Sequence, residues 1–136
     1  MTQMRWQCTE KGCYLQRRSD PVMFDGCFPA GVSMGDVDGI VELNGRFLIV
    51  EFKKLNISVP EGQARMFRRL VATGLFTILV VRAAEQHVEE WFEVTVDGSW
   101  RTYAGDSENL RDHVISWTQS VDPRLIALQE QQRPPS

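Results

Sequence analysis

The sequence predicts an α/β fold in which helices flank a mixed central sheet. Three successive segments indicate this architecture: a β-hairpin over about 36–53, a helix that begins near Pro60, and a strongly apolar strand over 75–82. A helix that joins two strands of one sheet fits a right-handed crossover. A length of 136 residues, with 43% hydrophobic and 24% charged side chains, is typical of one globular domain, which we expect over residues 1–122.

The two ends of the chain are expected to be less regular than its centre. Residues 1–35 contain Pro21, Pro29 and several glycines, which argue against a long helix in the second half of this segment. Residues 123–136 contain a run of glutamines and two adjacent prolines, which predicts a mobile tail or a docking peptide.

All three cysteines lie in the N-terminal segment, at Cys8, Cys13 and Cys27. The spacing of the first two is tolerable for zinc ligands, and His87 or His113 would complete a structural zinc site if the fold brought one of them close. Free or buried thiols are the alternative, and a disulfide is not expected in a reducing cytosol. Without a zinc role, both histidines are expected at the surface.

The hairpin over 36–53 is predicted from Asn44-Gly45, which stands between two apolar runs. This dipeptide is the strongest short-range hairpin signal, because a type I′ turn needs positive φ at both central residues. A two-residue turn also fixes the register, so Leu43 pairs with Arg46. Both faces of the hairpin are apolar away from one end, and we therefore expect the sheet to be covered on both sides.

Four charged side chains gather at that remaining end of the hairpin. The register places Asp38 opposite Glu51 and Asp36 opposite Lys53, and the alternation of side chains along a strand puts all four on one face. Two directly opposed carboxylates repel each other, a conflict that a divalent cation removes. The pattern predicts a metal-dependent site that cleaves phosphodiesters. The alternative is a charged end of the sheet with a cross-strand salt bridge.

A helix is predicted directly after the hairpin. Pro60 suits its first turn, and Gly74 ends it. Gln63 lies at the edge of its apolar stripe. The stripe comprises Met66, Phe67, Leu70 and Val71.

The last third of the chain predicts two short strands and a second helix. Val88–Val96 alternates as a strand does, Asp97-Gly98 is a turn, and Trp100–Tyr103 returns as a short strand. Asp106-Ser107 would cap a helix over about 107–119. Its apolar stripe is Leu110, Val114 and Trp117.

An Asp followed after twelve residues by Glu-x-Lys, at the end of an apolar strand, resembles the PD-(D/E)XK nuclease superfamily. The matching residues are Asp38, Glu51 and Lys53, within a resemblance that covers roughly Ser33 to Arg82. Many members also carry a Gln at the position of Gln63, in the helix after the hairpin.

The chain departs from the family pattern at one named position and before the first strand. The proline of the family's name is absent, since Gly35 precedes Asp36, and no clean amphipathic helix precedes the first strand. The fragment Gly-Asp-Val-Asp-Gly-Ile-Val-Glu also resembles small phage and prophage proteins of this superfamily.

The resemblance implies a restriction-endonuclease-like core that hydrolyses nucleic acid with Mg²⁺ or Mn²⁺. Mg²⁺ prefers hard oxygen ligands. The candidate ligands are Asp38, Glu51 and the backbone carbonyl of Phe52. Lys53 would orient or deprotonate the attacking water, or stabilise charge on the phosphate. Gln63 would hydrogen-bond a metal-bound water or the lysine, unless it is an ordinary exposed residue. Asp36 would be a second-metal ligand, an ion-pair partner of Lys53, or a structural residue before the strand.

The charge distribution is compatible with a nucleic-acid partner, most readily DNA, with RNA left open. The net charge is −3, but residues 1–82 carry +3 and residues 83–136 carry −6. A local positive patch is enough for salt-sensitive phosphate contact, although a solvated helix face explains the same arginines. The candidate contacts are Lys54, Arg65, Arg68 and Arg69. A short chain without a separate recognition domain also suggests a structure-selective or partner-guided enzyme, or a homodimer that engages two strands.

We expect no membrane partner and a cytoplasmic location, in the host cell if the chain is phage-encoded. The sequence has no stretch of eighteen uncharged apolar residues, and its N-terminus has no apolar signal-peptide core. The leading functional hypothesis is therefore a metal-dependent endonuclease. The alternatives are a binding protein with a nuclease fold that regulates or inhibits a partner without cleavage, and a zinc-stabilised nucleic-acid adaptor.

Overall fold

The structure is a computed structural model that describes residues 21–32, 35–85, 87–122 and Arg124. The chain divides into two compact units at Gly35. The described residues of the first unit contain one short 3-10 helix, η1 (Pro21–Phe24), followed by turns. This agrees with the expectation that no long helix lies there.

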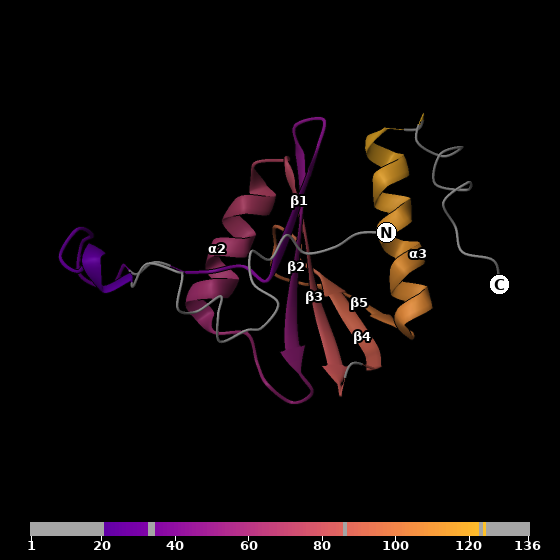
Figure 1. Ribbon diagram of the computed structural model, residues 1–136, viewed down its shortest axis with the longest axis horizontal. Coiled ribbons are helices and arrows are strands. Elements are labelled where there is room, and N and C mark those ends of the chain that lie inside the picture. Colours follow the sequence, from indigo (N-terminus) through magenta and orange to yellow (C-terminus); the bar gives the residue numbers. More distant parts are fainter. Residues whose placement is uncertain (1–20, 33–34, 86, 123, 125–136) are drawn as a thin grey trace. The chain divides into compact units, whose positions relative to one another are not determined.

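The second unit is an α/β fold with one mixed sheet of five strands and two helices (Figure 1). The strands lie in chain order across the sheet: β1 (Gly39–Leu43), β2 (Arg46–Lys54), β3 (Phe76–Ala84), β4 (His87–Glu93) and β5 (Arg101–Ala104). Only β2 and β3 are parallel, and the crossover between them is helix α2 (Glu61–Ala72). The other helix, α3 (Ser107–Val121), follows β5.

The hairpin register is the one that the turn predicts. Gly39 pairs with Val50 and Leu43 with Arg46, so that every opposed pair keeps the register set by the turn. Asn44 and Gly45 both have positive φ, at 51° and 78°, as a type I′ turn requires. The ladder begins at Gly39, so Asp38 lies one residue before β1 rather than within it.

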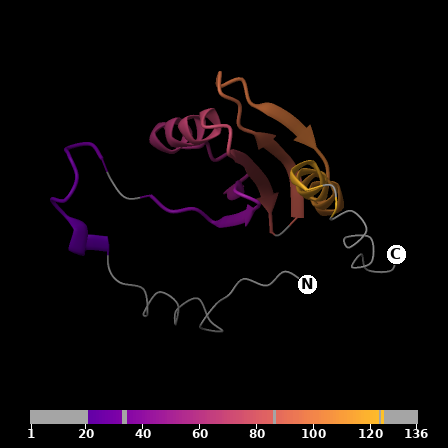
Figure 2. The same cartoon turned by 90° about the horizontal axis from the view of Figure 1, so that it is seen from above.

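Two apolar layers cover the two faces of the sheet, with α2 on one face and α3 on the other (Figure 2). On the α2 face, Phe67 is fully buried against Ile49, Ile78 and Val80. On the α3 face, Trp91 packs with β2 and β3 residues and with the helix stripe. The α3 members of this layer are Leu110, Val114 and Trp117, the three residues of the predicted stripe.

Coverage of the sheet is incomplete at the β1 edge, which corrects the expectation that both faces are covered. Ile40 and Val41 of β1 are about half exposed, as is Phe52 near the end of β2. The cause is the position of the two helices, because their packed layers contain residues of β2, β3 and β4 and none of β1.

The predicted strand over Val88–Val96 is three residues too long at its end. It stops at Glu93, although the Val94 N–H still donates to the Ile78 carbonyl at 3.0 Å. Beyond that point the Asp97 carboxylate accepts hydrogen bonds from the Thr95 hydroxyl and the Ser99 N–H. These local bonds stabilise a turn in place of further strand.

The helix ends follow their sequence signals. The side chain of Asp106 accepts from the Asn109 N–H at 3.0 Å, and Asn109 returns a bond to the Asp106 N–H, which makes a capping box at the start of α3. Gly74 adopts φ +79° just past α2. Neither of the two helices in the described part of the chain is long and apolar enough to cross a membrane.

We predict that Phe67→Ala lowers the free energy of unfolding by about 3–5 kcal/mol, because it leaves a cavity under α2. Urea denaturation would measure the loss. Val96→Ala is the control: Val96 is 61% exposed, so its truncation should change stability by no more than about 0.5 kcal/mol. Equal effects of the two substitutions would contradict the described core.

Candidate functional site

The acidic end of the hairpin is held by two reciprocal hydrogen bonds between its strands. The Asp38 N–H donates to Glu51 Oε2 at 3.3 Å, and the Phe52 N–H donates to Asp38 Oδ2 at 2.8 Å. Each carboxylate therefore accepts from the backbone of the opposite strand. Asp38 and Glu51 are brought together as the register predicts, and the N–H donors offset part of their mutual repulsion.

Glu51 is the buried centre of this group. Only 5% of the residue is exposed, and it is one of two buried charged residues in the described part of the chain. A buried carboxylate is costly unless its oxygens have partners. Glu51 Oε1 accepts from Gln63 Nε2 at 2.9 Å and lies 3.5 Å from Lys53 Nζ. The side chains of Glu51, Lys53 and Gln63 thus form one cluster, which Asp38 joins through its backbone N–H.

Two elements place this cluster. The strand alternation puts Glu51 and Lys53 on the same face of β2 as Ile49, which is the face that α2 covers. Gln63 lies in the first turn of α2, and the burial of Ala64 and Phe67 holds that helix against the sheet. The amide of Gln63 therefore reaches Glu51, a partner that the sequence analysis did not name for it.

One oxygen in the cluster is buried without a partner. Because a carboxylate only accepts hydrogen bonds, the Gln63 amide must turn its nitrogen toward Glu51. Its Oε1 then has no hydrogen-bond partner within the described residues, although it is buried. An orphaned acceptor at this position suits a water molecule, including one bound to a cation.

The oxygen atoms of this cluster fit a small hard cation that keeps most of its water ligands. Mg²⁺ is usually held by one or two carboxylates together with water and substrate oxygens. Asp38 and Glu51 supply two carboxylates on adjacent strands, and Gln63 Oε1 is an acceptor for a water of the ion. Among the residues described, no three His, Cys, Asp or Glu side chains cluster closely enough to hold a metal without such waters.

The other two candidate metal ligands, Phe52 and Asp36, form no hydrogen bond or ion pair with the side chain of Glu51. Phe52 has an exposed side chain on the opposite face of β2, and its N–H is used by Asp38. Asp36 is exposed and makes no hydrogen bond or ion pair with the described residues, while Lys53 pairs with Glu51 instead. The ion pair between Asp36 and Lys53 is therefore not formed, because the β1–β2 ladder begins only at Gly39.

Arg82 is a residue of this region that the sequence analysis did not single out. It lies beside Lys53 in the parallel β2–β3 register and on the same face. Its Nη1 donates to the Lys54 carbonyl at 3.0 Å and also to the Ile57 carbonyl. Its guanidinium lies 5.8 Å from the centre of the Phe92 ring. Arg82 thus holds the loop that follows Lys53 against β3. In the sequence, a charged residue at the end of an apolar strand was the feature that could have marked Arg82 as part of this region.

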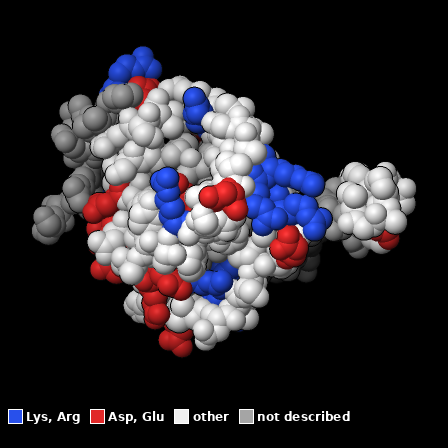
Figure 3. Space-filling model, turned by 180° about the vertical axis from the view of Figure 1, so that it is seen from behind, with Lys and Arg blue, Asp and Glu red and all other residues white. Residues whose placement is uncertain are grey.

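Of the four residues predicted to contact phosphate, three are exposed and one forms an ion pair. Lys54, Arg65 and Arg69 are exposed, while Arg68 pairs with Glu61 at 3.3 Å. Figure 3 shows a face on which Lys and Arg side chains gather in one area and the acidic side chains are more scattered. The exposed lysine and arginine side chains are accessible to a polyanion, whereas Arg68 is less accessible because it pairs with Glu61.

The zinc hypothesis falls largely outside the described residues. Cys8 and Cys13 lie outside them, and Cys27 is exposed and free of any disulfide. His87 is exposed, as expected. His113 is half-buried and so less exposed than expected: it packs edge-on to Trp91 and Tyr103, with ring centres 5.7 and 4.6 Å away, because the α3 stripe turns it toward β4 and β5.

No family model matches this chain, and neither a curated protein nor a solved structure similar to it was found.

We predict that Gln63→Leu destabilises the protein by about 1.5–3 kcal/mol, because it removes a hydrogen bond to a buried carboxylate. The comparison variant is Arg65→Leu, on the exposed side of the same helix, which should change stability by about 0.5 kcal/mol or less. Urea denaturation of both in metal-free buffer would measure the difference. A Gln63→Leu protein as stable as wild type would show that the bond to Glu51 does not form.

Proposed function

We propose that this protein is a Mg²⁺-dependent nuclease with a restriction-endonuclease-like core, and that DNA is its substrate. The observation that carries the proposal is the convergence of Asp38, Lys53 and Gln63 on the buried carboxylate of Glu51. Buried charges of this kind are costly to stability and are concentrated at functional sites.

The topology supports the same proposal. An antiparallel β1–β2 hairpin, the crossover helix α2 and a strand β3 parallel to β2 form the strand–strand–helix–strand unit that the resemblance implies. The acidic cluster lies at the carboxyl end of β2. Crevices outside the carboxyl ends of strands are where open α/β sheets bind their ligands.

The residues have separable roles in phosphodiester hydrolysis. Asp38 and Glu51 would hold the Mg²⁺ ion, which when bound supplies positive charge to the phosphate and lowers the pKa of a water. The ammonium of Lys53 stabilises negative charge that develops on the phosphate oxygens. Gln63 Oε1 accepts a hydrogen bond from the attacking water and so orients it.

The exposed basic residues near the site would bind the substrate. Lys54 directly follows the cluster on β2, and Arg65 and Arg69 lie four residues apart on one side of α2. Contacts of this kind bind phosphates without reading sequence, so we expect binding that weakens as salt rises.

The direct test is cleavage of duplex, single-stranded and branched DNA and of RNA, with Mg²⁺ or Mn²⁺ and with a chelator. We predict metal-dependent cleavage that falls by about 10²-fold or more in Lys53→Ala and in Asp38→Ala. Glu42→Gln is the matched control, because Glu42 lies on the same hairpin face at its other end and, among the described residues, accepts a hydrogen bond from the turn N–H of Gly45 alone.

Cleavage that survives in both variants, or that continues in chelator, would rule out the assigned site. Absence of cleavage on every substrate, with metal binding retained, would favour the alternative of a nuclease-fold binding protein.

Metal binding can be tested separately from cleavage by thermal unfolding. We predict that Mg²⁺ stabilises the wild-type protein by about 2.7 kcal/mol at a concentration one hundred times its Kd. Glu51→Gln should lose this stabilisation, while Glu42→Gln should keep it. A shift of equal size in Glu51→Gln would place the cation elsewhere.

A further inference from the structure

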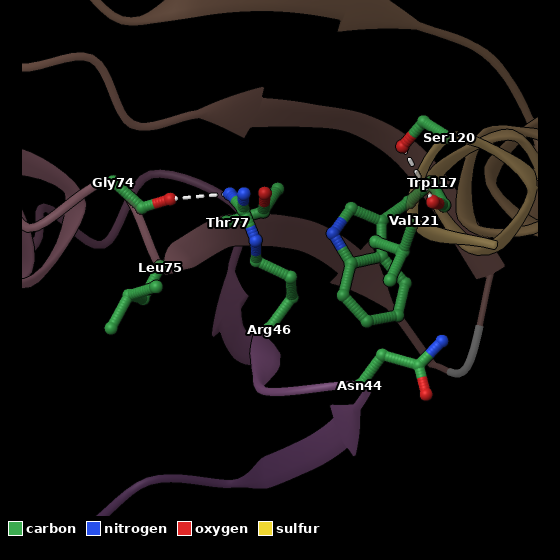
Figure 4. A pocket seen from close by; sticks show the side chains of 8 residues that line it. All are labelled: Asn44, Arg46, Gly74, Leu75, Thr77, Trp117, Ser120 and Val121. Atoms are coloured by element: carbon green, nitrogen blue, oxygen red, sulfur yellow. Dashed lines mark hydrogen bonds between the residues drawn. The ribbon is translucent and has the colours of Figure 1, made fainter.

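A hollow of about 420 Å³ lies at the opposite end of the sheet from the acidic cluster (Figure 4). It is bounded by the β1–β2 turn, by the connection between α2 and β3, and by the end of α3. Arg46 begins β2, so this hollow is roughly 16 Å along the strand from Glu51. Its volume is within the range of sites for small organic ligands.

Arg46 places a fixed positive charge in this hollow. Its Nη1 donates to the Gly74 carbonyl at 2.7 Å, and the neighbouring Phe47 N–H donates to the Leu75 carbonyl at 2.8 Å. These bonds hold the guanidinium against the chain that follows α2. Arg46 has no ion-pair partner within the described residues, so its other N–H groups remain available to an anion.

Asp122, which follows the hollow's lining residue Val121, already accepts hydrogen bonds from other side chains. Asp122 is buried, and Arg124 holds the pKa of its carboxyl well below the usual range through hydrogen bonds at 2.7 and 2.8 Å. Asp122 Oδ2 also accepts from Asn44 Nδ2 at 3.0 Å. The carboxylate therefore stays charged but has its own partners, and it does not line the hollow.

An indole ring and a second hollow adjoin the first hollow, and we call the two hollows together the groove. In Figure 4 the indole of Trp117 stands opposite Arg46, and its nitrogen faces the side on which Arg46 and Thr77 lie. The second hollow, of about 280 Å³, shares Thr77 and Trp117 and extends to His113 and Glu93. The Glu93 carboxylate has only long contacts, 3.9 Å to Arg101 and 3.7 Å to His113, and can accept further hydrogen bonds.

We propose that this groove binds a nucleoside monophosphate whose base carries an exocyclic amine. The phosphate pairs with the guanidinium of Arg46, which has the fork geometry that phosphate oxygens match. The base stacks on the Trp117 indole, as bases do on aromatic side chains. Its amine donates to Glu93. The ligand needs none of the residues of the acidic cluster, so this site stands whether or not the protein cleaves nucleic acid.

The test is calorimetric titration of AMP, adenosine, UMP and inorganic phosphate into the intact chain. We expect AMP to bind most tightly, because only AMP supplies phosphate, base and amine together. Arg46→Gln should weaken AMP binding by about tenfold or more and leave adenosine binding unchanged. Arg111→Gln removes an exposed arginine from α3 that lines neither hollow, and it should bind AMP as wild type does.

The indole N–H resonance of Trp117 gives a second readout that needs no variant at Arg46. AMP should shift this resonance more than those of the other tryptophans.

Arg46→Lys is the replacement variant if Arg46→Gln does not fold. It keeps the positive charge but not the fork of N–H donors, so it should bind AMP with an affinity between those of wild type and a variant without the charge. No AMP binding at millimolar concentration, equal binding by adenosine or phosphate alone, or an unshifted Trp117 resonance would overturn the proposal.

Discussion

The buried carboxylate of Glu51 is the constraint around which the central part of the fold is arranged. Its burial requires partners, and these come from three different places: the chain before β1, the carboxyl end of β2 and the first turn of α2. Loss of any one of them would leave a largely buried charged oxygen short of a donor. The hairpin, the crossover and the acidic cluster therefore depend on one another. A fold that needed only stability would have been served better by an apolar residue at this position.

The two ends of β2 differ in the sign of their charge and in the way that charge is stabilised. At the carboxyl end, carboxylates accept from backbone and side-chain donors. At the amino end, the guanidinium of Arg46 donates to the carbonyl of Gly74. One strand thus has hydrogen-bond acceptors gathered at one end and a hydrogen-bond donor at the other, separated by the apolar residues Leu48 and Ile49 that α3 and α2 bury.

Short-range signals made the hairpin and the helices predictable from sequence. Asn44-Gly45 determined the register because only one turn type suits that dipeptide, and the register then determined which side chains face each other. Gly74 and the Asp106 cap ended and began their helices for similarly local reasons. The crossover helix between two strands was likewise predicted, and its apolar stripe packs on the sheet, but the bond from Gln63 to Glu51 was not predicted.

What the sequence did not predict depends on contacts between distant segments. The bonds from Arg82 to the loop after β2 depend on the residue-by-residue register of β2 against β3, which the predicted crossover does not specify. The packing of His113 between Trp91 and Tyr103 likewise depends on how α3 crosses β4 and β5. The early end of β4 at Glu93 was missed because the Asp97 side chain competes with the ladder for donors.

The connectivity of the acidic cluster has a consequence for the order in which the protein folds. A hairpin closed by two residues forms in about 1–10 μs, whereas pairing β2 with β3 must first close a loop that contains all of α2. Asp38 and Glu51 therefore meet early, while the Gln63 amide arrives only when the crossover has docked. Until then Glu51 remains hydrated and the hairpin can open at little cost. The hydrogen bond between Gln63 and Glu51 therefore forms only once α2 has docked on β2, later than the contacts within the hairpin.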